Sequence, residues 1–204
     1  QTTESARARV ALETLLQAGS DPAQLAYALE SWIAYEAPDA ATLQYATRWA
    51  LEHDFPLLAA RIREHYRGPF PKRWDAQIAR DLGDREAMRI LLAQATAEEL
   101  GGAGPTAEFA LFAGDAARAE LEATSALDEA QTDALLALRA QARFTLGRSD
   151  EGLADVRAIG DRALRRETLL NLLAQAGSPA LARELSAFDS QAEAPAPQSG
   201  QQVQ

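Results

Sequence analysis

The sequence LFAGDAARAELEATSAL, from Leu111 to Leu127, contains the pattern that decides the fold class of this chain. Gly114 lies where a helix must end, because glycine lacks a Cβ atom and adopts the left-handed conformation that closes a helix C-terminus. Asp115 is predicted to cap the next helix, because its carboxylate can accept hydrogen bonds from the first free backbone N–H groups. The stretch therefore predicts two helices joined by a tight turn.

Small side chains recur along the second of these helices. Ala119, Ala123 and Ala126 follow one another at steps of four and three residues, which places them on one helix face. Such a face lets another helix approach closely. The alternative is that the alanines only raise the helix propensity of the segment. Recurrence of the pattern along the chain favours the first interpretation.

Five further turn sequences resemble this one and divide the chain into repeats. They are Gly19-Ser20-Asp21-Pro22, His53-Asp54, Gly83-Asp84, Gly147-Arg148-Ser149 and Gly177-Ser178-Pro179. The turns follow one another at intervals of 30 to 34 residues, within the range of repeats made of helix pairs. Apolar helical segments flank each turn, and no segment shows the alternation of a β-strand. The sequence predicts an all-α fold, an α-solenoid of about six antiparallel helix pairs.

The composition changes near residue 190, which predicts a domain boundary. Residues 190–204, SQAEAPAPQSGQQVQ, are dominated by Gln, Ala and Pro and contain one charged side chain, Glu193. Such a segment cannot bury enough apolar surface to offset the entropy lost on ordering. We therefore expect a helical-repeat domain at residues 1–189 and a disordered tail or linker at residues 190–204.

Charge and composition argue against several classes of function. The chain has 204 residues, 30 acidic and 20 basic groups and a formal net charge of −10, which disfavours nucleic-acid binding and docking on anionic lipid. No apolar run approaches the roughly 20 residues needed to span a membrane. The absence of cysteine excludes disulfides, thiolate catalysis and cysteine-ligated zinc.

The chain begins at Gln1 rather than Met. Removal of a signal peptide would produce such a start, and so would excision of a fragment. We expect a periplasmic location, with the cytoplasm as the alternative.

No arrangement of residues typical of a catalytic or metal site is present, so we expect no enzyme activity and no cofactor. The two histidines, His53 and His65, form no HExxH pair and are expected to have structural roles near helix ends. The glycine-rich segment Gly101-Gly102-Ala103-Gly104 follows a helix rather than a strand, which argues against a phosphate-binding loop. Asp54 and Asp128 are better explained as helix caps than as catalytic acids.

The segment Gly68–Trp74, GPFPKRW, combines two prolines, two aromatic residues and two cations. One interpretation is a docking loop or a cation–aromatic site. The other, which we favour, is that Phe70 and Trp74 fill the gap between the second and third helix pairs.

The Gly-Asp turn inside a helix pair, followed by alanines at fixed distances, resembles the tetratricopeptide repeat (TPR). The fourth copy matches best, with Gly114, Asp115, Ala119 and Ala126. The resemblance covers most of residues 5–188. Partial matches occur at Gly177 and Ala182 in the sixth copy and at Pro38 and Trp49 in the second.

The chain also departs from the TPR pattern. His53 takes the place of the turn glycine, and Gln24, Met88 and Gly152 stand where the first alanine is expected. The run Arg73-Trp74-Asp75 … Leu82-Gly83-Asp84 is similar to TPR segments of bacterial exopolysaccharide-export proteins. That resemblance implies a periplasmic scaffold for polymer-modifying or synthase partners.

The TPR resemblance implies that the first helix of each pair lines a concave surface that binds a protein or peptide partner. By analogy, the outward-facing candidates for partner binding are Arg73, Gln77, Arg80, Glu108, Gln141, Glu167 and Asn171. The alternative is that these are ordinary solvated positions. We expect a non-enzymatic interaction scaffold, in a bacterial envelope or export assembly. The alternatives are a helical accessory domain of a larger enzyme or secretion machine, and an all-α hydrolase, for which catalytic residues are missing.

Overall fold

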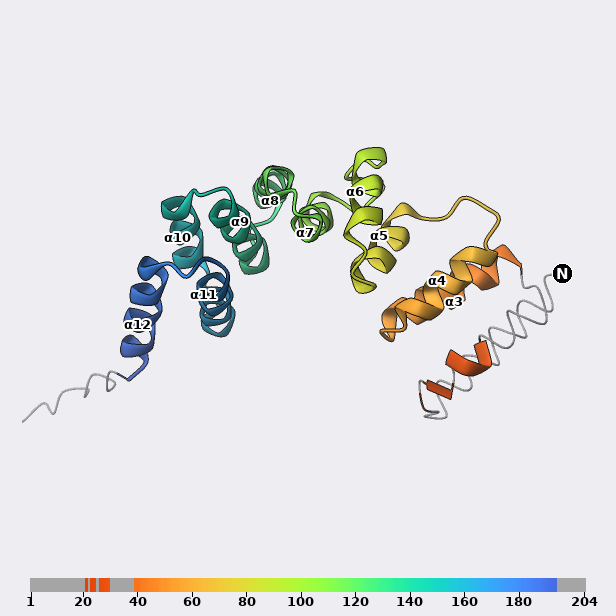
Figure 1. Ribbon diagram of the computed structural model, residues 1–204, viewed down its shortest axis with the longest axis horizontal. Helices are drawn as coiled ribbons and strands as arrows, with labels where there is room; N and C mark the ends of the chain where they lie inside the picture. Colours follow the sequence, from red (N-terminus) through yellow and green to blue (C-terminus); the bar gives the residue numbers. More distant parts are fainter. Residues whose placement is uncertain (1–20, 22, 25, 30–38, 194–204) are drawn as a thin grey trace, which may run out of the picture. The chain divides into compact units, whose positions relative to one another are not determined.

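The computed structural model describes residues 21, 23, 24, 26–29 and 39–193, and within them all regular secondary structure is α-helical (Figure 1). The predicted all-α class is confirmed. Pro38 and the first turn, apart from Asp21, lie outside the described residues. The helices are α3 (Ala40–Glu52), α4 (Pro56–His65), α5 (Lys72–Asp81), α6 (Arg85–Gln94), α7 (Ala103–Ala113), α8 (Ala116–Glu129), α9 (Asp133–Thr145), α10 (Ser149–Ala158), α11 (Arg162–Ala176) and α12 (Pro179–Glu193).

The chain divides into two compact units, Gln1–Gly114 and Asp115–Gln204, called here the N-terminal and C-terminal units. The division falls within the Gly-Asp turn that best matches the repeat pattern. Helix α12 continues to Glu193, beyond the boundary expected at residue 189. The remainder of the expected tail, residues 194–204, lies outside the described residues.

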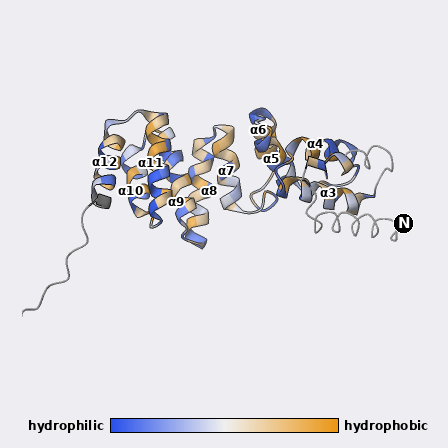
Figure 2. Cartoon of the chain, turned by 90° about the horizontal axis from the view of Figure 1, so that it is seen from below, coloured by the Kyte–Doolittle hydropathy of each residue, from blue (hydrophilic) through white to orange (hydrophobic). Residues whose placement is uncertain are grey.

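Neighbouring helices pack against one another in the N-terminal unit: α3 against α4, α5 against α6, and α6 against α7. In addition, α3 contacts α5 and α5 contacts α7. Most helices carry both hydrophobic and hydrophilic residues, as an amphipathic packing face requires (Figure 2). The core of this unit is built around fully buried Leu29 and Ile62, together with Trp49.

The segment Gly68–Trp74 connects α4 to the first turn of α5, and its two aromatic side chains fill the space there, as we favoured from the sequence. Phe70 and Trp74 are partly buried, pack against the core of the N-terminal unit and contact each other edge to face at 5.6 Å between ring centroids. The cation over the Phe70 ring, at 4.6 Å, comes from Arg63 on α4 rather than from the segment itself. Arg63 Nε also donates a hydrogen bond to Asp75 Oδ1 at 2.9 Å. Burial raises the pKa of the Asp75 carboxyl, and the bond from Arg63 acts in the opposite direction.

The turn after α3 corrects two predictions. Asp54 does not cap α4: it has a left-handed φ of 63°, and the N-cap is Phe55. The backbone N–H of Phe55 donates to the Ala50 carbonyl at 2.8 Å. The N–H of Asp84, which follows Gly83, donates in the same way to the carbonyl of Ala79, five residues earlier. Asp54, not His53, therefore takes the place of the turn glycine, since aspartate tolerates the left-handed region better than most side chains.

Two other turns test the predicted caps. Asp115 accepts a hydrogen bond from the Arg118 backbone N–H at 3.0 Å, so it caps α8 as predicted. The prediction for Asp128 is wrong, because this residue lies inside α8. Thr132 caps α9 instead, through a 3.3 Å bond from the Leu135 N–H to its hydroxyl. A threonine hydroxyl, like a carboxylate, can accept the bond that caps a helix at that position.

In the C-terminal unit, α9 contacts α8 and α10, while α11 packs against both α9 and α12. The predicted alanine face of α8 is buried, with exposed fractions of 2%, 0% and 7% for Ala119, Ala123 and Ala126. Fully buried Leu169 and Leu172 of α11 are at the centre of a core that α9, α10 and α12 complete.

Gly152 explains one departure from the TPR pattern. A Cβ atom at this position would lie 2.6 Å from Phe144 Cδ2 and 3.2 Å from the Ala140 carbonyl oxygen. The Phe144 ring of α9 occupies the space that an alanine methyl group at position 152 would need. Glycine at this position therefore allows α9 and α10 to approach closely.

We predict that Gly152→Ala lowers the free energy of unfolding. Overpacking costs about 1–3 kcal/mol, more than the helix propensity that alanine adds, which is at most about 1 kcal/mol. Urea denaturation followed by circular dichroism measures the difference. In a Phe144→Leu background the added methyl group should cost less than half as much. An equal cost in both backgrounds would show that the Phe144 ring is not the obstacle.

Candidate functional site

Helices α9 and α11 border a cleft of about 200 Å³ in the C-terminal unit. Its lining combines aliphatic side chains with polar ones. The aliphatic residues are Ala134, Ala137, Leu138, Leu164 and Leu172, and the polar residues are Gln141, Glu167, Thr168 and Asn171.

The polar residues of the cleft differ in whether they are already engaged. Thr168 is buried, and its hydroxyl donates to the Leu164 carbonyl at 2.7 Å. By contrast, the side chains of Gln141, Glu167 and Asn171 form no hydrogen bond or ion pair with any described residue. Glu167 and Asn171 are exposed and Gln141 is half-buried. The cleft thus presents free amide and carboxylate groups beside an aliphatic surface.

These three residues are among the seven candidates that the sequence predicted, and the structure brings them together. The other four lie in the N-terminal unit, on α5 and α7. Arg80 of α5 donates from Nη1 to Glu108 Oε2 of α7 at 3.4 Å, and from Nε to Asp81 at 2.9 Å. Arg80 and Glu108 are thus engaged with each other, and Gln77 on the same face of α5 is half-buried.

The remaining candidate, Arg73, is exposed near the start of α5. Its aliphatic stem lies against Gly101, where an added Cβ atom would come within 2.9 Å of Arg73 Cδ. Gly101 also has a φ of 99°, which disfavours any side chain. This glycine-rich segment therefore accommodates the Arg73 stem.

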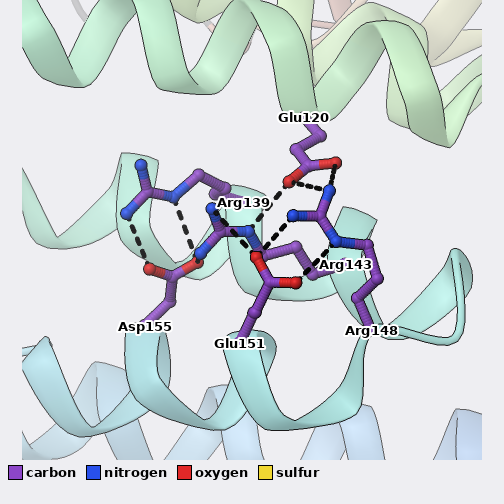
Figure 3. Close-up of polar contacts among 6 residues, drawn as sticks. All are labelled: Glu120, Arg139, Arg143, Arg148, Glu151 and Asp155. Carbon is purple, nitrogen blue, oxygen red and sulfur yellow. Dashed lines mark hydrogen bonds and ion pairs between the residues drawn. The ribbon is translucent and has the colours of Figure 1, made fainter.

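A second polar cluster, which the sequence prediction missed, joins α8, α9 and α10 (Figure 3). Its most buried member is Asp155 of α10, only 4% exposed. Arg139 of α9 bonds Asp155 through both carboxylate oxygens, at 2.7 and 3.1 Å. Arg143, one turn further along α9, donates to Asp155 at 2.8 Å and to Glu120 of α8 at 2.9 Å.

Arg148 extends the cluster from the turn before α10. It donates to Glu120 Oε1 at 2.7 Å and also pairs with Glu151. The hydrogen bond from Arg148 lowers the pKa of the Glu151 carboxyl. Three guanidinium groups thus face three carboxylates, and each carboxylate is engaged by at least one arginine. Its ion pairs connect α8, α9 and α10.

Acid conditions should weaken the C-terminal unit through carboxylates whose pKa is lowered. Backbone N–H groups of Asp161 and Gly160 donate to Asp133 at 2.7 and 3.1 Å and lower its pKa. The hydrogen bond from Arg157 likewise lowers the pKa of Glu184. A carboxylate whose pKa is lower in the folded state stabilises the fold at pH values above its unfolded-state pKa of about 4. This stabilisation is lost as the pH falls through the folded-state pKa.

We therefore predict that the thermal midpoint of the chain decreases as the pH is lowered from about 5 to about 3. In Asp133→Asn this decrease should be less steep. Melting curves followed by circular dichroism at a series of pH values measure both slopes. Glu129→Gln, which removes an exposed carboxylate with no partner among the described residues, should leave the slope unchanged. Identical slopes in wild type and Asp133→Asn would contradict the assignment.

The described part of the chain contains no group of three or more His, Asp or Glu side chains placed to hold a metal ion. In the same residues, no helix has the length and apolar character that crossing a membrane requires. Comparison with known protein families, with curated proteins and with solved structures gives no match to this chain.

Proposed function

We propose that the chain is a non-enzymatic scaffold that binds a protein or peptide partner in the cleft between α9 and α11. Its architecture would be a TPR-like α-solenoid of six helix pairs. Contacts between alternate helices support this: α3 with α5, α5 with α7, and α9 with α11. Such contacts are expected where stacked helix pairs bury a continuous core.

The observation that carries the proposal is that three polar side chains of the cleft have no hydrogen-bond or ion-pair partner among the described residues. The arginine and carboxylate side chains of the cluster that joins α8, α9 and α10 are paired with one another. The amides of Gln141 and Asn171 and the Glu167 carboxylate remain available beside an aliphatic surface. That combination suits a surface completed by a partner. By the resemblance of the Arg73–Asp84 region, the proposed setting is a bacterial envelope or export assembly in the periplasm.

The test is affinity capture from the native organism with the full chain as bait, followed by mass spectrometry. The cleft variant is Gln141→Ala/Glu167→Ala. Its matched control is Glu129→Ala/Gln131→Ala, which removes the same two side-chain types from exposed positions outside the cleft. We expect wild type and control to enrich the same partner, and the cleft variant to lose it.

Melting temperatures are measured in parallel. Glu129, Gln131 and Glu167 are exposed, and Gln141 is half-buried with no side-chain partner among the described residues, so we expect only small differences in melting temperature among the three baits. A partner captured equally by the cleft variant would refute the proposed surface. Loss of the partner together with a large drop in melting temperature would point to unfolding instead.

A further inference from the structure

We propose that the cleft between α9 and α11 recognises one lysine or arginine side chain of an extended peptide segment. The inference rests on the proposed function and names the chemistry of its partner. Three properties of the cleft carry it: volume, charge and the distribution of hydrogen-bond acceptors.

The volume sets the scale of the ligand. Sites for small molecules and cofactors usually occupy about 300–1,000 Å³, whereas this cleft has about 200 Å³. It is therefore suited to a single long side chain, with the rest of the peptide lying outside.

The charge selects a cation. Glu167 is the only charged residue of the nine that line the cleft. Every arginine of the C-terminal unit is engaged elsewhere within the described residues: most pair with carboxylates, Arg162 lies over the Phe188 ring at 5.1 Å, and Arg183 donates to a backbone carbonyl. The described part of this unit has no free cation for Glu167, and the unit as a whole has fourteen acidic groups against nine arginines. A basic partner would supply the missing charge.

The surface chemistry matches the two parts of a lysine or arginine side chain. Leu138 and Leu164, both half-buried, offer contacts to the aliphatic stem, which such residues commonly bury while keeping the charged end solvated. The Glu167 carboxylate and the amide oxygens of Gln141 and Asn171 can accept N–H bonds from the charged end. An acidic side chain would be repelled by Glu167, and an apolar one would make no use of these acceptors.

The experiment selects random peptides, displayed on phage, against the full chain. The baits are wild type, Glu167→Gln, Glu167→Lys and the matched controls Glu129→Gln and Glu129→Lys. We expect wild type and both controls to enrich lysine or arginine at one peptide position, and Glu167→Lys to lose this enrichment. Synthetic copies of the selected peptides should bind Glu167→Gln roughly two- to fivefold more weakly than wild type, as for a partly exposed ion pair.

Wild-type selection without basic enrichment would overturn the inference, and so would equal peptide affinity for wild type and Glu167→Gln. The proposed function can survive that result, because partner capture would still depend on Gln141→Ala/Glu167→Ala. If partner capture is also indifferent to this double variant, both proposals fail.

Discussion

Asp155→Ala is expected to lower the free energy of unfolding by about 3–5 kcal/mol, the cost of breaking a buried ion pair by removing one partner. Asp155 is almost fully buried and engages two guanidinium groups, whose side chains on α9 are only 18% and 16% exposed. Removing the carboxylate leaves Arg139 without an ion pair in a poorly hydrated position. Because Arg143 keeps its ion pair with Glu120, we expect a loss in the lower half of this range.

Urea denaturation monitored by circular dichroism measures this loss. The control is Asp150→Ala, which removes an exposed aspartate from the first turn of the same helix. That change costs at most about 1 kcal/mol, through the helix dipole. Equal losses for the two variants would show that the cluster contributes no more than a surface charge does.

The helical class and the cap at Asp115 were predictable because the chemistry involved is local. A glycine that ends a helix and an aspartate that caps the next one act within about three residues, so Gly114 and Asp115 can be identified from adjacent letters. Asp54 shows the limit of this approach. It performs the role of a turn glycine without being one, and only the backbone hydrogen bond of Phe55 reveals the register.

The arginine cluster was missed because it depends on packing between helices. Arg139 and Arg143 are four residues apart on α9, and Glu151 and Asp155 are four apart on α10. This spacing was a usable signal, since it places the two arginines on one face of α9 and the two carboxylates on one face of α10. Whether those faces meet depends on how α9 and α10 rotate about their axes. That rotation is governed by core contacts such as Phe144 against Gly152, which the sequence alone does not reveal.

Three of the residues that line the cleft were among the candidates predicted from the sequence. Gln141, Glu167 and Asn171 were chosen by analogy with the TPR register, and they lie on α9 and α11, which contact each other. The register did not distinguish engaged side chains from free ones, because Arg80 and Glu108 were selected by the same rule and bond to each other. Side-chain reach and the local supply of counter-charges decide that difference.

Leu172→Ala should lower the free energy of unfolding by about 2–5 kcal/mol, whereas Asn171→Ala should change it by no more than about 0.5 kcal/mol. The two residues are adjacent, and both line the cleft, but Leu172 is 1% exposed and belongs to the core of the C-terminal unit. Asn171 is exposed and has no partner among the described residues. Leu172→Met, which nearly conserves volume, should cost less than about 1.5 kcal/mol.

This contrast bears on function because it separates the surface that maintains the fold from the surface that remains free. If Asn171→Ala weakens peptide binding at unchanged stability, the amide acts on the ligand and the core supports it from beneath. Urea denaturation of the three variants, combined with binding of the same basic peptide, measures both quantities. A loss of stability from Asn171→Ala comparable to that from Leu172→Ala would mean that the edge of the cleft is part of the core. Gln141 and Glu167 would then have to be reassessed as structural residues as well.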